Sequence, residues 1–127
     1  MAVDKIMAAK NLNYAFTHSS YLAGTVGAYL EISKKNVSTP TWGGLIQITP
    51  TNGGQAALYG AFINSVGTVF LSPIVADSNS GYSITTETNK IKIECTARVA
   101  AYYVTTYAPK TETTDIQIYR SDTGDIT

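Results

Sequence analysis

The sequence has little of what enzymes, metal sites or disulfide-stabilised domains need. Its 127 residues include one Cys and one His, so an intrachain disulfide is excluded and a Cys/His metal cage within one chain is implausible. Charged residues make up 14% of the chain, and nine Lys plus Arg balance nine Asp plus Glu. Such a balance gives no strong electrostatic field toward nucleic acid or an anionic membrane. We therefore expect no nucleic-acid partner, no metal and no cofactor.

Long apolar runs are also lacking. Near the N-terminus a four-residue apolar run, residues 6–9, lies between Lys5 and Lys10. It is far shorter than the roughly 7 to 15 residues of a signal-peptide core. No later stretch approaches the roughly 20 apolar residues that span a bilayer. We expect neither membrane insertion nor export through a signal peptide.

What the chain does have is enough hydrophobic sequence, 44% of its residues, to fold as a single domain. We divide it into an N-terminal segment, 1–20, and a β domain, 21–127. The spacing of apolar residues predicts a short helix over 3–16, which either docks on the domain or pairs with copies of itself. The segment serves oligomerisation or attachment in this interpretation.

From residue 24 onward, short runs rich in β-branched and aromatic residues end at Gly, Asn, Pro or Ser, and 18 residues of the chain are Thr. The turn signals recur about every 10 residues without a helical pattern between them. This predicts an all-β fold, an antiparallel β-sandwich of about eight strands resembling a jelly roll. The predicted strands are 28–33, 44–49, 55–63, 67–75, 82–87, 90–96, 99–107 and 114–120.

The pattern of apolar residues differs among these strands. Residues 90–95 alternate apolar with charged side chains, which is typical of a strand with one face toward water. Residues 56–63, 66–71 and 99–104 carry apolar side chains on both faces, and one copy of the chain offers little to cover them. We therefore predict a homo-oligomer. The aromatic candidates for its interface are Tyr59, Phe62, Phe70, Tyr102 and Tyr103.

No group of residues indicates catalysis. His18 has Ser19 and Ser20 as immediate neighbours, and adjacent residues do not normally present a nucleophile and its base in the required geometry. Cys95 is in register with the apolar side chains of its strand, so we interpret it as structural. The carboxylates are scattered, without a glycosidase pair or a calcium loop. We expect a protein that is not an enzyme.

A ligand site, if the loops converge, would use aromatic and amide groups near the turns. An aromatic face combined with planar hydrogen-bonding groups is suited to a sugar. For Trp42 a role in the core is the stronger interpretation, and turn formation by itself explains the Asn residues. The candidate ligand-binding residues are Trp42, Asn52, Asp77, Asn79 and Tyr82.

Three segments resemble the distal domains of bacteriophage tail fibres and related virion appendages. They are residues 22–30 (LAGTVGAYL), 82–87 (YSITTE) and 102–107 (YYVTTY). The resemblance implies a trimeric β-sandwich that forms virion structure or binds host-cell surfaces. It also implies a protein made in the host cytoplasm and located in the virion. The chain departs from the family in lacking a long fibrous shaft and a virion-attachment domain.

These observations lead to one hypothesis and three alternatives. The hypothesis is a non-enzymatic virion component of the tail-fibre type, a homotrimer that binds host-surface glycans or other virion proteins. The first alternative is a carbohydrate-binding module of a secreted bacterial protein, which would be a monomer with an aromatic-lined groove. The others are a small hydrolase with an unrecognised site and a structural subunit without any ligand.

Overall fold

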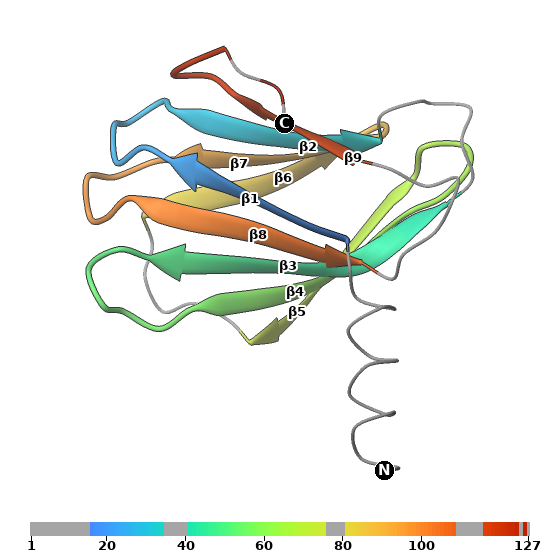
Figure 1. Cartoon of the computed structure of the whole chain (residues 1–127), viewed down its shortest axis with the longest axis horizontal. Helices are drawn as coiled ribbons and strands as arrows, with labels where there is room; N and C mark the ends of the chain where they lie inside the picture. Colours follow the sequence, from blue (N-terminus) through green and yellow to red (C-terminus); the bar gives the residue numbers. More distant parts are fainter. Residues whose placement is uncertain (1–15, 35–40, 76–80, 109–115, 125, 127) are drawn as a thin grey trace, which may run out of the picture.

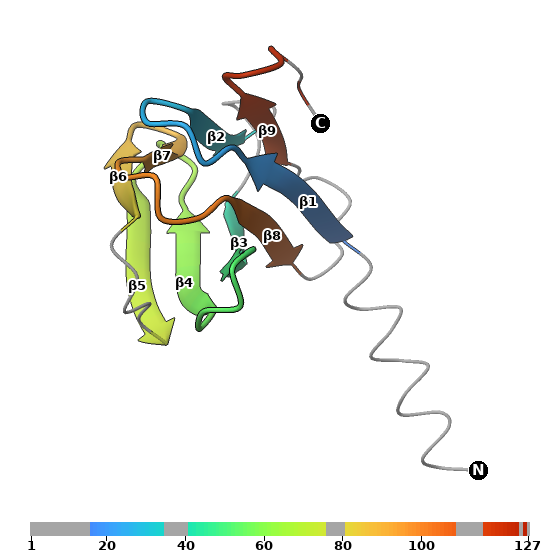
Figure 2. The same ribbon diagram turned by 90° about the vertical axis from the view of Figure 1, so that its left-hand side faces the viewer.

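The part of the chain that the structure describes folds into nine β-strands that form two antiparallel sheets (Figures 1 and 2). A computed structural model describes residues 16–34, 41–75, 81–108, 116–124 and 126. The strands are β1 (Phe16–Leu22), β2 (Tyr29–Lys34), β3 (Trp42–Pro50), β4 (Ala57–Ile63), β5 (Val69–Val75), β6 (Tyr82–Glu87), β7 (Lys90–Cys95), β8 (Tyr102–Ala108) and β9 (Ile116–Arg120). The prediction of an all-β antiparallel fold is confirmed.

The two sheets bring together the beginning and the end of the chain. One sheet has the strand order β1-β8-β3-β4-β5, and the other has the order β6-β7-β2-β9. In Figure 1 the first strand, β1, lies beside the late strand β8, and β2 lies between the late strands β7 and β9. This nested pairing is the jelly-roll part of the fold. The strands β3, β4 and β5 depart from it, because they follow one another as a simple meander in one sheet.

Each predicted strand has a counterpart, and one strand was missed. Five of the seven residues of β1, Phe16–Ser20, belong to what the sequence analysis assigned to the N-terminal segment. It was missed because its central residues, Thr17 to Ser20, are polar and carry no apolar alternation. Its formation depends on β8, with which it pairs over its whole length, from Phe16 opposite Ala108 to Leu22 opposite Tyr102. The helix predicted over 3–16 lies outside the described residues, except for Phe16, which begins β1.

The core lies between the sheets and is built by alternation along the strands. In β7 the side chains of Ile91, Ile93 and Cys95 are fully buried, whereas the Lys and Glu between them face outward. This confirms the prediction that residues 90–95 form a strand with one face buried and the other toward water. The inward row of β2 is buried in the same way and ends at Lys34, whose ammonium donates to the backbone oxygen of Asn64 at 3.0 Å. The largest fully buried side chains are Tyr102, Leu22, Leu30, Ile32, Ile46, Ile48, Ile63, Ile91, Ile93, Ile118, Val104 and Thr106.

Candidate functional site

The two sheets present outer faces of opposite character. The described strands of the five-stranded sheet, β1, β8, β3, β4 and β5, contain no Lys, Arg, Asp or Glu. The four-stranded sheet carries the charges, and they pair with each other: Lys90 lies 3.2 Å from Glu31, and Lys92 lies 3.4 Å from Glu94. The described strands on one side of the sandwich therefore form an ordinary hydrated surface, and those on the other side carry no Lys, Arg, Asp or Glu.

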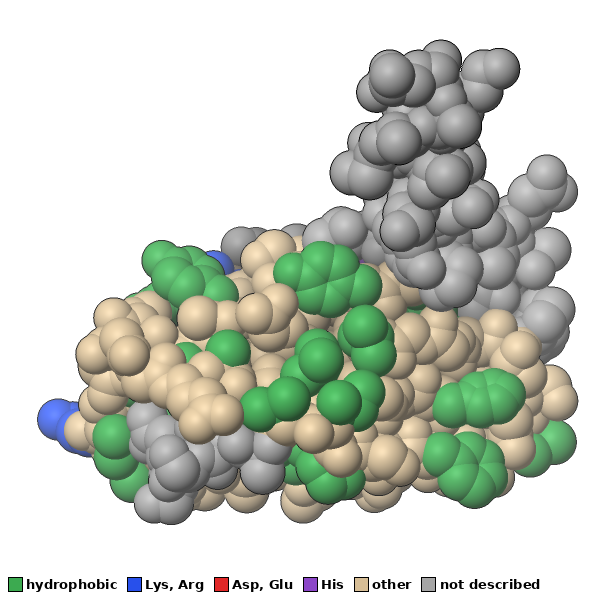
Figure 3. Space-filling model, turned by 90° about the horizontal axis from the view of Figure 1, so that it is seen from below, with side chains coloured by type: hydrophobic (Ala, Val, Ile, Leu, Met, Phe, Trp, Pro, Cys, Tyr) green, Lys and Arg blue, Asp and Glu red, His purple; other side chains and the backbone are tan. Residues whose placement is uncertain are grey.

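Exposed apolar side chains gather on the uncharged side. Phe62 of β4 and Phe70 of β5 are cross-strand partners with ring centroids 6.2 Å apart, and they are 38% and 56% exposed. Together with Leu45, Ile74 and Val75 they form what we call the apolar patch. Figure 3, which views the molecule from the side of β3, β4 and β5, shows hydrophobic side chains adjoining one another, with Lys or Arg only at the rim of the described surface. A contiguous exposed patch of this kind is typical of an interaction surface.

A second pair of aromatic rings, one of them exposed, lies at the other end of the same sheet. Tyr21 of β1 and Tyr103 of β8 are cross-strand partners with ring centroids 5.6 Å apart. Tyr103 is 52% exposed, and the guanidinium of Arg120 lies 5.5 Å from the centre of the Tyr21 ring. We call this pair the tyrosine patch. The uncharged face thus carries two distinct aromatic surfaces.

Of three tyrosines predicted for surface roles, Tyr102 is buried and Tyr59 and Tyr82 are half-buried. Tyr102 has no exposed surface and belongs to the core, because the inward residues of β8 are the even-numbered ones. Tyr82 packs its ring on Tyr102 edge to face, at 5.0 Å. The hydroxyl of Tyr82 is hydrogen-bonded across the sheets to that of Tyr59, at 3.2 Å. These three side chains join β4, β6 and β8, so Tyr102 offers nothing to a partner and Tyr59 and Tyr82 are half-buried.

The two other candidate ligand residues that the structure describes, Trp42 and Asn52, lie at opposite ends of β3. Trp42 lies at the start of β3, not on a loop, and is 3% exposed in the core. Asn52 is exposed beyond the opposite end of β3, where its side-chain oxygen accepts a hydrogen bond from the backbone N–H of Gly54 at 3.1 Å. Asp77 and Asn79 lie outside the described residues. Among the described candidates, the structure therefore does not bring Trp42, Asn52 and Tyr82 to one surface, and the predicted sugar site stays a prediction.

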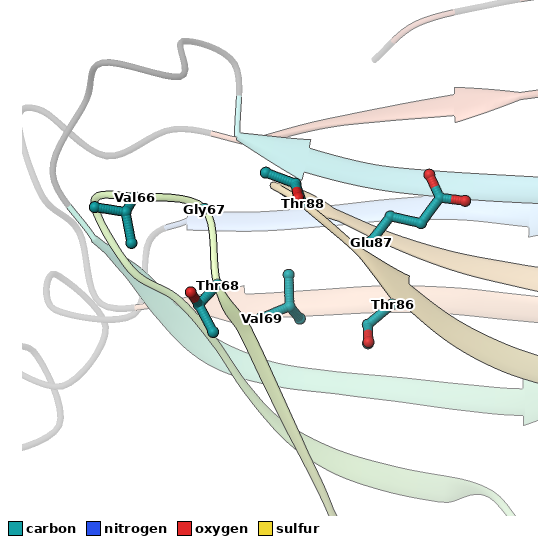
Figure 4. A pocket seen from close by; sticks show the side chains of 7 residues that line it. All are labelled: Val66, Gly67, Thr68, Val69, Thr86, Glu87 and Thr88. Atoms are coloured by element: carbon teal, nitrogen blue, oxygen red, sulfur yellow. The ribbon is translucent and has the colours of Figure 1, made fainter.

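A pocket of about 350 Å³ that the sequence analysis did not identify lies between two turns. We call it the threonine pocket. The β4–β5 turn and the start of β5 form one wall, and the end of β6 with the β6–β7 turn forms the other (Figure 4). Its lining residues are Val66, Gly67, Thr68, Val69, Thr86, Glu87 and Thr88. Each wall comes from a different sheet, so no local sequence signal could have placed the two together.

The walls of this pocket are held by short-range hydrogen bonds. In the β4–β5 turn, the side-chain oxygen of Asn64 accepts from the backbone N–H groups of Val66 at 3.1 Å and Thr68 at 2.8 Å. The backbone N–H of Asn89 donates to the oxygen of Gly67 at 2.8 Å and connects the two turns. Asn89 has a φ of 61° and Gly67 a φ of 91°, conformations that Asn and Gly adopt most readily.

Acid and base groups are not gathered anywhere in the described part of the chain. His18 is half-buried on β1, opposite Thr106, and Cys95 is buried in β7. The described residues contain no cluster of three or more His, Cys, Asp or Glu that could hold a metal ion. The guanidinium of Arg120, hydrogen-bonded to the carboxylate of Asp122 at 2.7 and 3.0 Å, lowers the pKa of Asp122 below its ordinary value of 3.8. That ion pair lies on the surface and stabilises the carboxylate form.

Among the described residues, no helix has the length and the apolar character needed to cross a membrane. No protein-family model matches the chain, and no curated protein sequence matches it either.

Two solved structures match the chain, and the first of them, with a TM-score above 0.5, is similar to it in fold. One is tailspike protein gp49 of Acinetobacter baumannii bacteriophage Fri1, a capsular polysaccharide depolymerase, with a TM-score of 0.52 at 15% identity. That match covers 79% of this chain and 18% of the tailspike chain, so the similarity concerns a small part of a much longer protein. The other is the tailspike protein of Acinetobacter phage vB_ApiP_P1, with a TM-score of 0.43 at 17% identity, covering 83% of this chain and 22% of that chain.

Proposed function

We propose that the chain is a non-enzymatic module of a phage tail, of the receptor-binding or virion-structural type, that assembles as a homotrimer and engages host-surface glycans. The observation that carries this proposal is the uncharged outer face of the five-stranded sheet, on which Phe62 and Phe70 stand exposed and in contact. The similarity in fold to part of a phage tailspike supports the part of the proposal that assigns the chain to a phage tail. In this proposal the protein is located in the virion.

The chemistry of this face favours another copy of the chain as its partner. The apolar patch contains no charged side chain, so it gains nothing from a charged partner and would desolvate that partner's charges at a cost. A trimer around a three-fold axis needs two different patches that fit each other, because each interface joins one side of a subunit to another side of the next. The apolar patch and the tyrosine patch are two such surfaces on one sheet. In the trimer the first packs against the second of the neighbouring copy.

In this proposal the chain has no catalytic role. Three of the four carboxylates that the structure describes, Glu31, Glu94 and Asp122, are engaged with Lys or Arg. A carboxylate that is already ion-paired is a poor candidate for a general acid, whose pKa must be raised. The trimer would instead work by avidity, since three weak sites that engage one cell surface together bind far more tightly than one.

The competing interpretation, a monomeric carbohydrate-binding module, needs an aromatic platform in a groove. Trp42 would have to supply it, and its side chain packs in the core with 3% exposure. It would have to leave the core to stack on a sugar, at the cost of the packing that it provides. The trimeric interpretation places no such demand on a buried residue.

Sedimentation equilibrium or light scattering on the full chain tests the proposal. We expect a mass of three chains of 13.6 kDa at micromolar concentration. Phe70→Glu places a charge in the apolar patch and should give one chain. Thr85→Glu is the matched control, because it adds the same charge to the exposed outer face of β6, opposite Lys92. A strictly monomeric wild-type chain would overturn the assembly.

A further inference from the structure

We propose that Pro73 and the β-bulge beside it prevent β5 from pairing with a strand of another copy, so that copies of the chain do not join their sheets edge to edge. The strand β5 lies at one end of the five-stranded sheet, and in the part of the chain that the structure describes it pairs with β4 alone (Figure 2). This property belongs to the edge of the sheet and not to its outer face, so it holds whether or not the chain forms the proposed trimer.

The composition of β5 makes it a template for unwanted pairing. Its seven residues, VFLSPIV, include no charged side chain, and Phe70, Ile74 and Val75 are all exposed. An edge strand that is exposed, apolar and uncharged readily adds strands of other molecules through its free backbone groups. Apart from Pro73, the strand has the high β-propensity and low charge of sequences that form cross-β aggregates. We therefore expect β5 to contain a feature that opposes pairing.

The β4–β5 turn shows which backbone groups of β5 point toward the free edge. The backbone N–H of Asn64 donates to the oxygen of Thr68 at 3.0 Å, so these two residues form a hydrogen-bonded pair. Hydrogen-bonded and non-hydrogen-bonded pairs alternate along an antiparallel ladder. Through the regular register that follows, the even-numbered residues of β5 are therefore bonded to β4, and the groups of the odd-numbered ones, as far as Pro73, point away from it.

Pro73 removes a hydrogen-bond donor from this free edge. It lies opposite Tyr59, at one of the positions that point away from β4. Because a proline has no backbone N–H, an edge donor is missing here while no bond to β4 is lost. Prolines within sheets are confined to positions of this kind. Before the proline, Val69 and Leu71 keep both edge groups, and a ladder of this length is shorter than the strands of ordinary sheets.

The β-bulge that follows Pro73 has the same effect on the rest of the edge. The register shifts between Leu58 and Tyr59, because Leu58 pairs with Val75 and leaves Ile74 as an extra residue of β5. Ile74 and Val75 are both exposed, so the alternation along the strand is interrupted at this point. A bulge bends its strand and increases the local twist. Beyond the proline the edge therefore does not present a straight row of donors and acceptors to another strand.

The other edge strands of the two sheets are less apolar or are covered. On the side of β9 away from β2, Tyr119 forms an antiparallel bridge with Ile126. The strand β6 ends with the exposed carboxylate of Glu87, and a charge on an edge opposes pairing. The centre of β1, residues 17–20, is polar. Among these strands β5 has the most exposed apolar surface, and it is the one that contains a proline.

Amide hydrogen exchange of the full wild-type chain, followed by nuclear magnetic resonance, tests the free edge. We expect the backbone amides of Phe70 and Ser72 to be protected by β4, and those of Val69 and Leu71 to exchange at least about tenfold faster because they point to the edge. Equal protection of the two sets would show that the edge is already paired and would overturn the inference.

Pro73→Thr tests the role of the proline, because it restores the edge donor and adds a β-branched side chain. We expect light scattering to detect species larger than the wild-type assembly, in which exchange at Val69 and Leu71 is slowed by at least about tenfold. Ser72→Thr is the matched control, since it adds the same side chain where the backbone N–H already points to β4. This control should keep the wild-type mass and exchange rates.

Far-ultraviolet circular dichroism establishes that both variants are folded, and loss of a proline from a compatible position lowers stability only slightly. A folded Pro73→Thr chain with wild-type mass and exchange rates contradicts the inference, as does a Ser72→Thr chain that associates to the same extent. If Pro73→Thr does not fold, the wild-type exchange rates decide the question. A monomeric wild-type chain with rapidly exchanging edge amides would contradict the proposed trimer and support the protected edge.

Discussion

The backbone N–H of Asn89 donates a 2.8 Å hydrogen bond to the carbonyl oxygen of Gly67, and this bond joins a turn of the four-stranded sheet to a turn of the five-stranded sheet. The contact is close because Gly67 has no side chain, and the space that a Cβ would need is occupied by Thr88 and Asn89. This bond connects the two sheets at one end of the sandwich. The threonine pocket lies beside it, since Gly67 and Thr88 are among its lining residues.

Gly67→Ala should destabilise the fold more than Gly27→Ala. Both glycines have a positive φ, 91° and 94°, which costs an L-residue roughly 1 to 2 kcal/mol. A Cβ at Gly27 meets nothing within 4 Å, whereas one at Gly67 meets the Thr88 side chain at 2.8 Å. Crowding of this kind adds about 1 to 3 kcal/mol. Urea denaturation of both variants measures the difference in their free energies of unfolding. Equal losses of stability would mean that the two turns can move apart to admit the Cβ without a loss of free energy.

Trp42→Ala should lower the free energy of unfolding by about 3 to 5 kcal/mol, because it removes the largest side chain type from a buried position. Trp42→Phe, which keeps a ring there, should cost less. Circular dichroism during chemical denaturation gives both values. A loss below about 1 kcal/mol for the alanine variant would show that Trp42 contributes little to the core and would restore it as a surface candidate.

The thiol of Cys95 should not react with a thiol reagent such as dithionitrobenzoate while the chain is folded. Its side chain is fully buried, and Sγ donates to the backbone oxygen of Ala97 at 3.4 Å. After addition of denaturant, one thiol per chain should react. Rapid modification of the native protein would mean that β7 opens readily, since the reagent cannot reach a buried sulfur otherwise.

The contribution of Asp122 to stability should be present near neutral pH and lost in acid. Hydrogen bonds from Arg120 lower the pKa of this carboxyl in the folded chain below its ordinary value of 3.8. A lowered pKa stabilises the folded state above the unfolded pKa, and the gain disappears as the pH falls through the folded pKa. Asp122→Asn should therefore be less stable than the wild type near neutral pH and equally stable once the pH lies below both the folded and the unfolded pKa of Asp122. Because the pair is exposed, the difference is small, and a difference that persists in acid would contradict its assignment to this pair.

Local sequence patterns were sufficient to predict most of the strands. They were also sufficient to predict which side chains between Lys90 and Cys95 are buried. There the alternation of apolar and charged residues determines which face is buried, and each neighbour along the strand repeats the signal. The strand β1 lacked such a signal. Thr17, His18 and Ser19 form a strand because β8 supplies their hydrogen-bonding partners, and that pairing joins residues about 90 positions apart.

The roles of single aromatic residues were harder to predict for a related reason. Tyr102 and Tyr103 are adjacent and chemically identical, yet one is fully buried and the other 52% exposed, because successive side chains of a strand point to opposite faces. Trp42 was placed just before a strand, with a core role as its stronger interpretation, and β3 begins at this residue and turns it into the core.

Sequence alone determined the all-β antiparallel class, the low charge and the existence of apolar strand faces that one copy does not cover, since these depend on composition and on repeats of two residues. Tertiary structure decided which sheet is uncharged, which tyrosines are exposed and that two distant turns enclose a pocket. Those properties depend on strand order, and strand order follows from long-range backbone pairing that leaves no local trace in the sequence.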